Sequence, residues 1–228
     1  MKALLYKEFK LAMHPICYIF IAMFPFMILI PSYPLGIGFI YVLTCYPILF
    51  LGANKGQQSN DLLFSTLLPI RKKDIVKARI GTCAVMHFAF IIIMCCLYPL
   101  ALNLNKQLAS TSPDVAAPGL TLNGFFSVVA IALLGYAIAD LIFFPIYYKK
   151  GKSIVMSTLF TILGFIVYLS IFTIAMPYMP GGETYTKILC DSGYGIQFII
   201  LGAALVLYII IHILVYKISA KRLELVDF

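Results

Sequence analysis

The chain has 228 residues, of which 62% are hydrophobic and only 11% are charged. Its mean hydropathy of +1.00 excludes a soluble domain of this length, because water could not solvate so apolar a surface. The formal net charge of +8 comes without any nucleic-acid-binding motif. It therefore indicates contact with anionic lipid headgroups, and no nucleic-acid partner is expected.

The first predicted element is an amphipathic interfacial helix within residues 1–14. Its apolar face would carry Leu5, Phe9, Ala12 and Met13, and its polar face Lys7, Lys10 and His14. Such a helix lies in the headgroup plane, and here it would turn at Pro15 into the first membrane span. The alternative is a cytoplasmic extension of that span.

Six apolar runs follow, each close to the roughly 20 residues that cross a bilayer. They cover residues 15–31, 35–53, 80–102, 123–147, 153–176 and 196–216. The sequence therefore predicts an all-α integral membrane fold with six transmembrane helices in a single domain, 1–228. In the fifth run, small residues recur at Ser153, Ser157, Thr161 and Gly164. They favour close helix packing within the chain over the alternative of a dimer face.

The basic residues predict the orientation, because Lys and Arg resist translocation. With the N-terminus inside, all of the 17 Lys and Arg residues except Lys106 and Lys187 fall in cytoplasmic segments. Both termini are therefore expected to be cytoplasmic. One of these segments carries five of the basic residues within nine positions: Arg71, Lys72, Lys73, Lys77 and Arg79.

Between the second and third runs, residues 59–68 predict a short two-faced helix. Ser59 or Asn60 can cap its N-terminus, and Pro69 ends it. Its two sides would carry Leu63, Phe64, Leu67 and Leu68 on one and Asp61, Ser65 and Thr66 on the other. Asp74 would then lie in the first turn of the helix that enters the third span. The short helix would either be gripped by a soluble partner or lie on the headgroups.

Two ionisable residues inside the predicted spans are candidate functional residues. Asp140 is the only acid within a span, and His87 lies at nearly the same depth on another span. Because such residues are costly in lipid, they usually face a cavity or a partner. Asp140 would either line a pathway for a cationic substrate or form a buried pair with His87, Tyr136 or a hydroxyl. His14 and His212 lie near inner ends and are expected to face headgroups.

Enzymatic signatures are missing from the sequence. It has no His-Glu-x-x-His zinc pair, no Gly-x-Ser-x-Gly elbow and no phosphate-binding loop of the Gly-x-x-x-x-Gly-Lys-Ser/Thr type. No metal site and no cofactor are predicted for this chain. The chain is therefore not expected to be an enzyme.

The segment DLLFSTLLPIRKKDIVKAR (residues 61–79) resembles the signature of the ABC-2 type permeases. In that family a coupling helix after the second span is followed by Leu-Pro and a basic run, here Leu68, Pro69 and Arg71. Six spans and the amphipathic N-terminus also resemble that family. One departure is Lys55, where larger family members often carry an acid before the coupling helix.

This resemblance implies the permease subunit of an ATP-driven exporter in a bacterial plasma membrane. Two copies of a separate ATPase, which hold ATP and Mg, would pair with two permease chains, expected as a homodimer. The implied contacts to the ATPase are Ser59, Asn60, Asp61, Leu62, Leu63, Phe64, Ser65, Thr66 and Leu67, with Arg71, Lys72 and Lys73 as the basic part of the coupling segment.

Short chains of this kind most resemble exporters of amphipathic, phenol-soluble-modulin-type peptides. Drugs, lantibiotics and lipid-linked molecules are alternative substrates. A proton-coupled secondary transporter with Asp140 and His87 as its relay, and a non-transporting membrane scaffold, are alternative functions.

Overall fold

The computed structural model describes residues 2–12, 15–29, 70–111, 124–150, 154–171, 178–182, 184, 187–188 and 193–225, and within these residues the chain is helical and contains no strand. The elements are α1 (Lys2–Lys7), a π-helical turn (Glu8–Ala12), α2 (Pro15–Met23), a 3-10 helix (Phe24–Leu29), α5 (Lys72–Thr111), α7 (Phe125–Lys150), α8 (Ile154–Ser170) and α11 (Tyr194–Glu224). The predicted second span (35–53) and coupling helix (59–68) lie outside the described residues.

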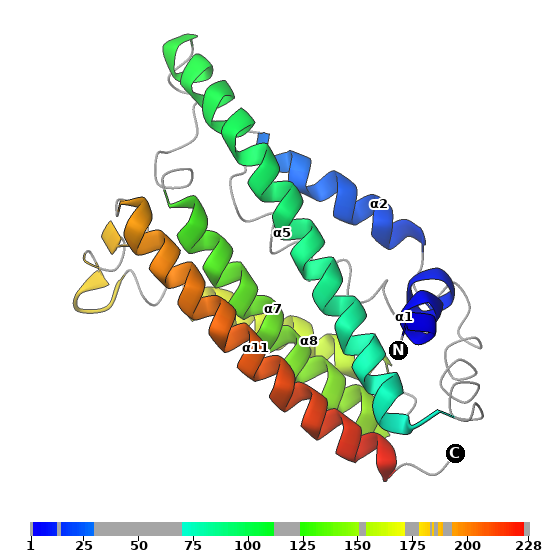
Figure 1. Ribbon diagram of the computed structural model, residues 1–228. Coiled ribbons are helices and arrows are strands. Elements are labelled where there is room, and N and C mark those ends of the chain that lie inside the picture. Colours follow the sequence, from blue (N-terminus) through cyan, green and yellow to red (C-terminus); the bar gives the residue numbers. More distant parts are fainter. Residues whose placement is uncertain are drawn as a thin grey trace.

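Three helices in the described part of the chain are long and apolar enough to cross a membrane, namely α5, α7 and α11. They contain most or all of the predicted spans 80–102, 123–147 and 196–216, and they run side by side along the molecule (Figure 1). The helix α8 and the first predicted span are apolar but shorter. The all-α membrane fold is thus confirmed in its class, and the number of six spans stays a prediction.

The helix α7 lies at the centre of the bundle and α11 at its edge. In the most apolar stretch of α7, 61% of the residues are buried, against 17% in α11. The buried residues of α11 follow one narrow stripe, with Ala204, Tyr208, Val215, Ser219 and Leu223 among them. Their spacing of four and seven residues is that of a helix packed along a single seam, and that seam faces α7.

The small residues of α8 pack against α7 within the same chain. Ser157 and Thr161 are fully buried, and a Cβ added to Gly164 would come within 2.3 Å of the Ile142 side chain of α7. From the other side, a Cβ on Gly135 of α7 would lie 2.8 Å from the Phe165 ring. Small residues thus allow the two helices to approach closely, as the spacing in the sequence predicted.

The N-terminal helix α1 lies across one end of α5, and α2 then runs along the same helix (Figure 1). Leu5 of α1 contacts α5 where Gly81 leaves room, because a Cβ at that glycine would be 3.8 Å from the Leu5 side chain. Tyr6 and Lys10 point outward and bond to each other, with Lys10 Nζ 2.8 Å from the Tyr6 hydroxyl. In this segment Leu5 thus faces α5, whereas Tyr6 and Lys10 face outward; the placement of an amphipathic helix in the headgroup plane stays a prediction.

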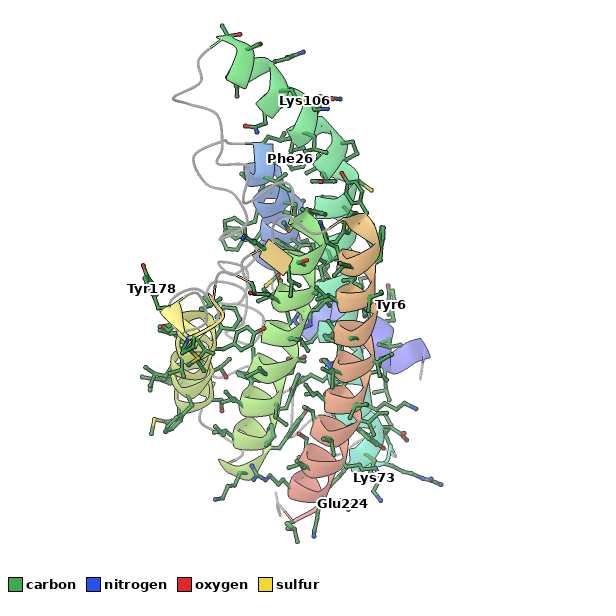
Figure 2. All side chains as sticks on the ribbon, turned by 90° about the vertical axis from the view of Figure 1, so that its left-hand side faces the viewer. Tyr6, Phe26, Lys73, Lys106, Tyr178 and Glu224 are labelled. Carbon is green, nitrogen blue, oxygen red and sulfur yellow. The ribbon has the colours of Figure 1, made fainter. Side chains whose placement is uncertain are left out.

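The start of α5 and the end of α11 lie at the same end of the bundle. There Lys73 Nζ is 3.2 Å from Glu224 Oε1, and Arg222 donates to the Pro145 carbonyl near the end of α7. Figure 2 shows Lys106, one of the two lysines predicted to be extracellular, at the opposite end from Lys73 and Glu224. Asp74 lies in the first turn of α5, as predicted.

Candidate functional site

Three side chains from the three long helices meet inside the bundle: His87 of α5, Asp140 of α7 and His212 of α11. Asp140 Oδ2 is 2.8 Å from His212 Nε2 and 3.8 Å from His87 Nδ1. The side chains of His87 and Asp140 are fully buried, and that of His212 is 12% exposed. We call these residues the histidine–aspartate cluster.

Aromatic residues of α7 and α11 hold the two imidazole rings in place. His87 stacks on Tyr136 at 4.8 Å between ring centroids, and its Nδ1 is 3.1 Å from the Tyr208 hydroxyl. Tyr208 also stacks on His212 at 3.9 Å. Tyr208 lies on the buried stripe of α11. His212, one turn later, therefore lies at the edge of the same seam.

The hydrogen bonds of His212 restrict where its protons lie. Its Nδ1 is 2.9 Å from the Tyr208 carbonyl oxygen, which only accepts, so this nitrogen is the donor. Its Nε2 faces the Asp140 carboxyl group at 2.8 Å. Either His212 is an imidazolium beside a carboxylate, or Asp140 is protonated and donates a hydrogen bond to Nε2 of a neutral His212. In both cases the Nε2–Oδ2 contact holds one exchangeable proton.

The structure brings together the two residues that the sequence singled out and adds a third. Asp140 and His87 are buried close to each other, and Tyr136 lies beside them. The expectation that His212 faces headgroups is wrong, because its ring bonds to Asp140 inside the bundle. A signal was available, since His212 is an ionisable residue inside an apolar run, but its place near the end of the run suggested an interfacial position.

A second buried polar cluster joins the N-terminal segment to α5 and α7. Arg79 Nε is 2.9 Å from Glu8 Oε2, and Arg79 Nη2 is 3.4 Å from Oε1. Arg79 Nη1 also donates to the Tyr147 hydroxyl at 3.1 Å. Glu8 and Arg79 are 3% and 4% exposed. We call these residues the Glu8–Arg79–Tyr147 cluster.

Sequence reasoning missed this second cluster. It counted Arg79 among the basic residues of a cytoplasmic surface, whereas the guanidinium group is buried and paired. It did not single out Glu8, although this is the only acid in residues 1–14. A lone acid in an otherwise basic interfacial helix is a usable signal, because a buried Arg needs a partner.

The predicted contacts to an ATPase, Ser59 to Leu67, lie outside the described residues. The basic part of the coupling segment is described: Arg71 and Lys73 are exposed, and Lys72 is half-buried. Arg71 directly precedes α5, and Lys72 and Lys73 are its first two residues. In the sequence, residues 59–71 are therefore followed directly by the helix that contributes to both clusters.

Long apolar helices with buried polar clusters between them define a helical membrane protein. The sequence matches the family described as ABC-2 family transporter protein over residues 3–223, and the chain belongs to this family. It is therefore the membrane component of a transporter, a permease and not a catalytic subunit, and permeases of this family generally work with an ATPase subunit. No curated protein and no solved structure matches the chain.

Proposed function

We propose that this permease forms, with a second copy, the translocation pathway of an ATP-driven exporter whose ATPase is a separate chain. The 59–68 segment docks on the ATPase and moves α5. Amphipathic, cationic peptide-like molecules are the proposed substrates, and the bacterial plasma membrane with both termini inside is the proposed location.

The family match supports the transporter class of this proposal, and the Glu8–Arg79–Tyr147 cluster supports its coupling step. Arg79 lies seven residues after the start of α5, which is about 10 Å along the helix. There it is bonded to the N-terminal segment and to α7. A displacement that enters α5 from residues 59–71 would therefore reach α7 and the N-terminal segment through one buried set of bonds, and not through α5 alone.

The coupling step is tested by replacing Phe64 with Ala in the affinity-tagged full-length chain, purified from the membranes of its own cells. Aromatic anchors dominate protein interfaces and can cost several kcal/mol when truncated. We expect Phe64→Ala to remove the co-purifying ATPase activity. Phe160→Ala is the matched control, since Phe160 is an exposed aromatic residue on α8, far from this segment in the sequence. Unchanged ATPase recovery with Phe64→Ala would favour a helix that rests on the headgroups.

The substrate class is tested on the purified complex in lipid nanodiscs. A cationic amphipathic peptide is expected to stimulate ATP hydrolysis and to be transported. A scrambled peptide of the same composition, which has no apolar face, is the control. Equal stimulation by both peptides, or stimulation only by drug-like or lipid-linked compounds, would contradict the peptide assignment and leave the export function standing.

A further inference from the structure

We propose that His87, Asp140 and His212 bind one divalent transition-metal ion, with Zn²⁺ as the best match, and that this ion joins α5, α7 and α11 inside the membrane domain. The proposal rests on the histidine–aspartate cluster alone. It does not depend on the substrate or on the ATPase.

The distances within the cluster suit a small ion. One ligand atom from each residue can be chosen so that all three lie within 4.8 Å of one another. Zn²⁺ bonds to nitrogen and oxygen are about 2.0–2.1 Å long, so a tetrahedral site places its ligand atoms about 3.3 Å apart. The contacts of Asp140 Oδ2 with His212 and His87, at 2.8 and 3.8 Å, lie on either side of that value. The longest separation, up to 4.8 Å, would have to shorten by about 1.5 Å for the three ligand atoms to share one ion.

The donor set selects the kind of metal. Two imidazoles, which are ligands of borderline softness, together with one hard carboxylate suit Zn²⁺ and its neighbours in the first transition series. Mg²⁺ and Ca²⁺ take oxygen ligands, and a single carboxylate oxygen would hold them poorly. Three protein ligands also leave a fourth position open, as in zinc sites that bind water.

The surroundings of His212 resemble those of a metal-bound histidine. Its Nδ1 donates to the Tyr208 carbonyl, so Nε2 is the nitrogen that faces Asp140. Metal-binding histidines usually donate their other nitrogen to a carbonyl or carboxylate in this way, which fixes the ring and its tautomer. The ion would take the place of the proton between Nε2 and Oδ2, and that proton would be released.

The position of the cluster gives the ion a structural role. His212 is the only member with an exposed part of its side chain, on the helix at the edge of the bundle. Each of the three ligands comes from a different long helix, so one ion would cross-link all three helices. Such a link stabilises the arrangement in which the ligand atoms are close.

The test uses the full-length permease in nanodiscs, stripped with a chelator and then equilibrated with ZnCl₂ or CoCl₂. We expect one Zn²⁺ per chain after desalting, and a rise in the melting temperature of several degrees. Co²⁺ is expected to give the visible absorption of a nitrogen- and oxygen-bound ion, without a thiolate charge-transfer band. These results on the unmodified protein do not depend on whether a variant folds.

Asp140→Asn and His212→Gln are each expected to weaken Zn²⁺ binding more than about 100-fold, because even outer-shell changes cost 10–100-fold. Asp74→Asn, the same chemical change in the first turn of α5, should bind as the unmodified chain does. Less than one Zn²⁺ per unmodified chain would overturn the proposal. So would a cobalt–thiolate band, or full Zn²⁺ binding by Asp140→Asn.

Discussion

The Glu8–Arg79–Tyr147 cluster and the histidine–aspartate cluster share two helices and differ in the segment that completes them. Arg79 and His87 lie eight residues apart on α5, and Asp140 and Tyr147 lie seven apart on α7, so each helix carries both clusters within about 12 Å. At one end the third partner is Glu8 from the N-terminal segment. Deeper in the bundle it is His212 from α11.

This difference shows which cluster the fold depends on more. The seam between α7 and α11 is already held by a stripe of buried apolar residues, so His212 would stay near Asp140 without any bond. Glu8, by contrast, is a charged group on a short segment, and its burial requires Arg79. We therefore expect the Glu8–Arg79–Tyr147 cluster to matter chiefly for stability. The histidine–aspartate cluster is expected to tolerate a change in its protonation, in its hydrogen-bond partners or in a bound metal.

The largest expected effect follows from breaking the Glu8–Arg79 pair. Glu8→Gln removes the carboxylate and leaves a buried guanidinium without its counter-charge, which typically costs about 3–5 kcal/mol. Thermal unfolding in detergent is the measurement, with a large fall in melting temperature expected. The double change Glu8→Met with Arg79→Met should recover most of the loss, because two well-packed apolar side chains replace a buried ion pair at little cost. No loss from Glu8→Gln would contradict this ranking of the clusters.

A smaller effect is expected at the histidine–aspartate cluster. Asp140→Asn in chelator-treated protein should cost about 1–3 kcal/mol, the usual result of leaving a buried polar group unsatisfied, with membrane bonds at the low end of this range. Double-mutant cycles measured by melting temperature identify the partner. The coupling free energy between Asp140 and His212, whose ligand atoms are 2.8 Å apart, should exceed that between Asp140 and His87, which are 3.8 Å apart. The reverse order would mean that His87 is the main partner.

The smallest effect is expected at the exposed pair of Lys73 and Glu224. Their side chains are 55% and 45% exposed, and such surface pairs contribute at most about 1 kcal/mol. Glu224→Gln is therefore the matched control for Glu8→Gln, with the same chemical change and the same method. A loss of stability as large as that of Glu8→Gln would show that the start of α5 and the end of α11 depend on this contact for their association.

The sequence predicted the helices better than it predicted the contacts between them. An apolar run and a helix start are local properties, so α5 begins with Asp74 in its first turn as expected. The shared depth of Asp140 and His87 followed from counting residues along two spans. The partnership with His212 did not, because α11 is apolar all round and its composition does not indicate which side faces α7.

The same reason explains why Arg79 was assigned to a surface. Its neighbours Lys73 and Lys77 are exposed, whereas Arg79 is buried, and only the position of the N-terminal segment distinguishes them. That segment is joined to α5 across 71 positions of sequence. Periodicity within one helix gives a direction for each side chain, and it gives no information on what another segment places there.

The length of α5 has a mechanical consequence. Its 40 residues span about 60 Å, roughly twice the thickness of the hydrocarbon core, and its far end projects beyond the other helices (Figure 1). If the helix pivots at His87, where α7 and α11 hold it, the arm to Thr111 is about 1.6 times as long as the arm to Lys72. A movement at the end that follows the predicted coupling segment would then arrive enlarged, and reversed in direction, at the opposite face of the membrane.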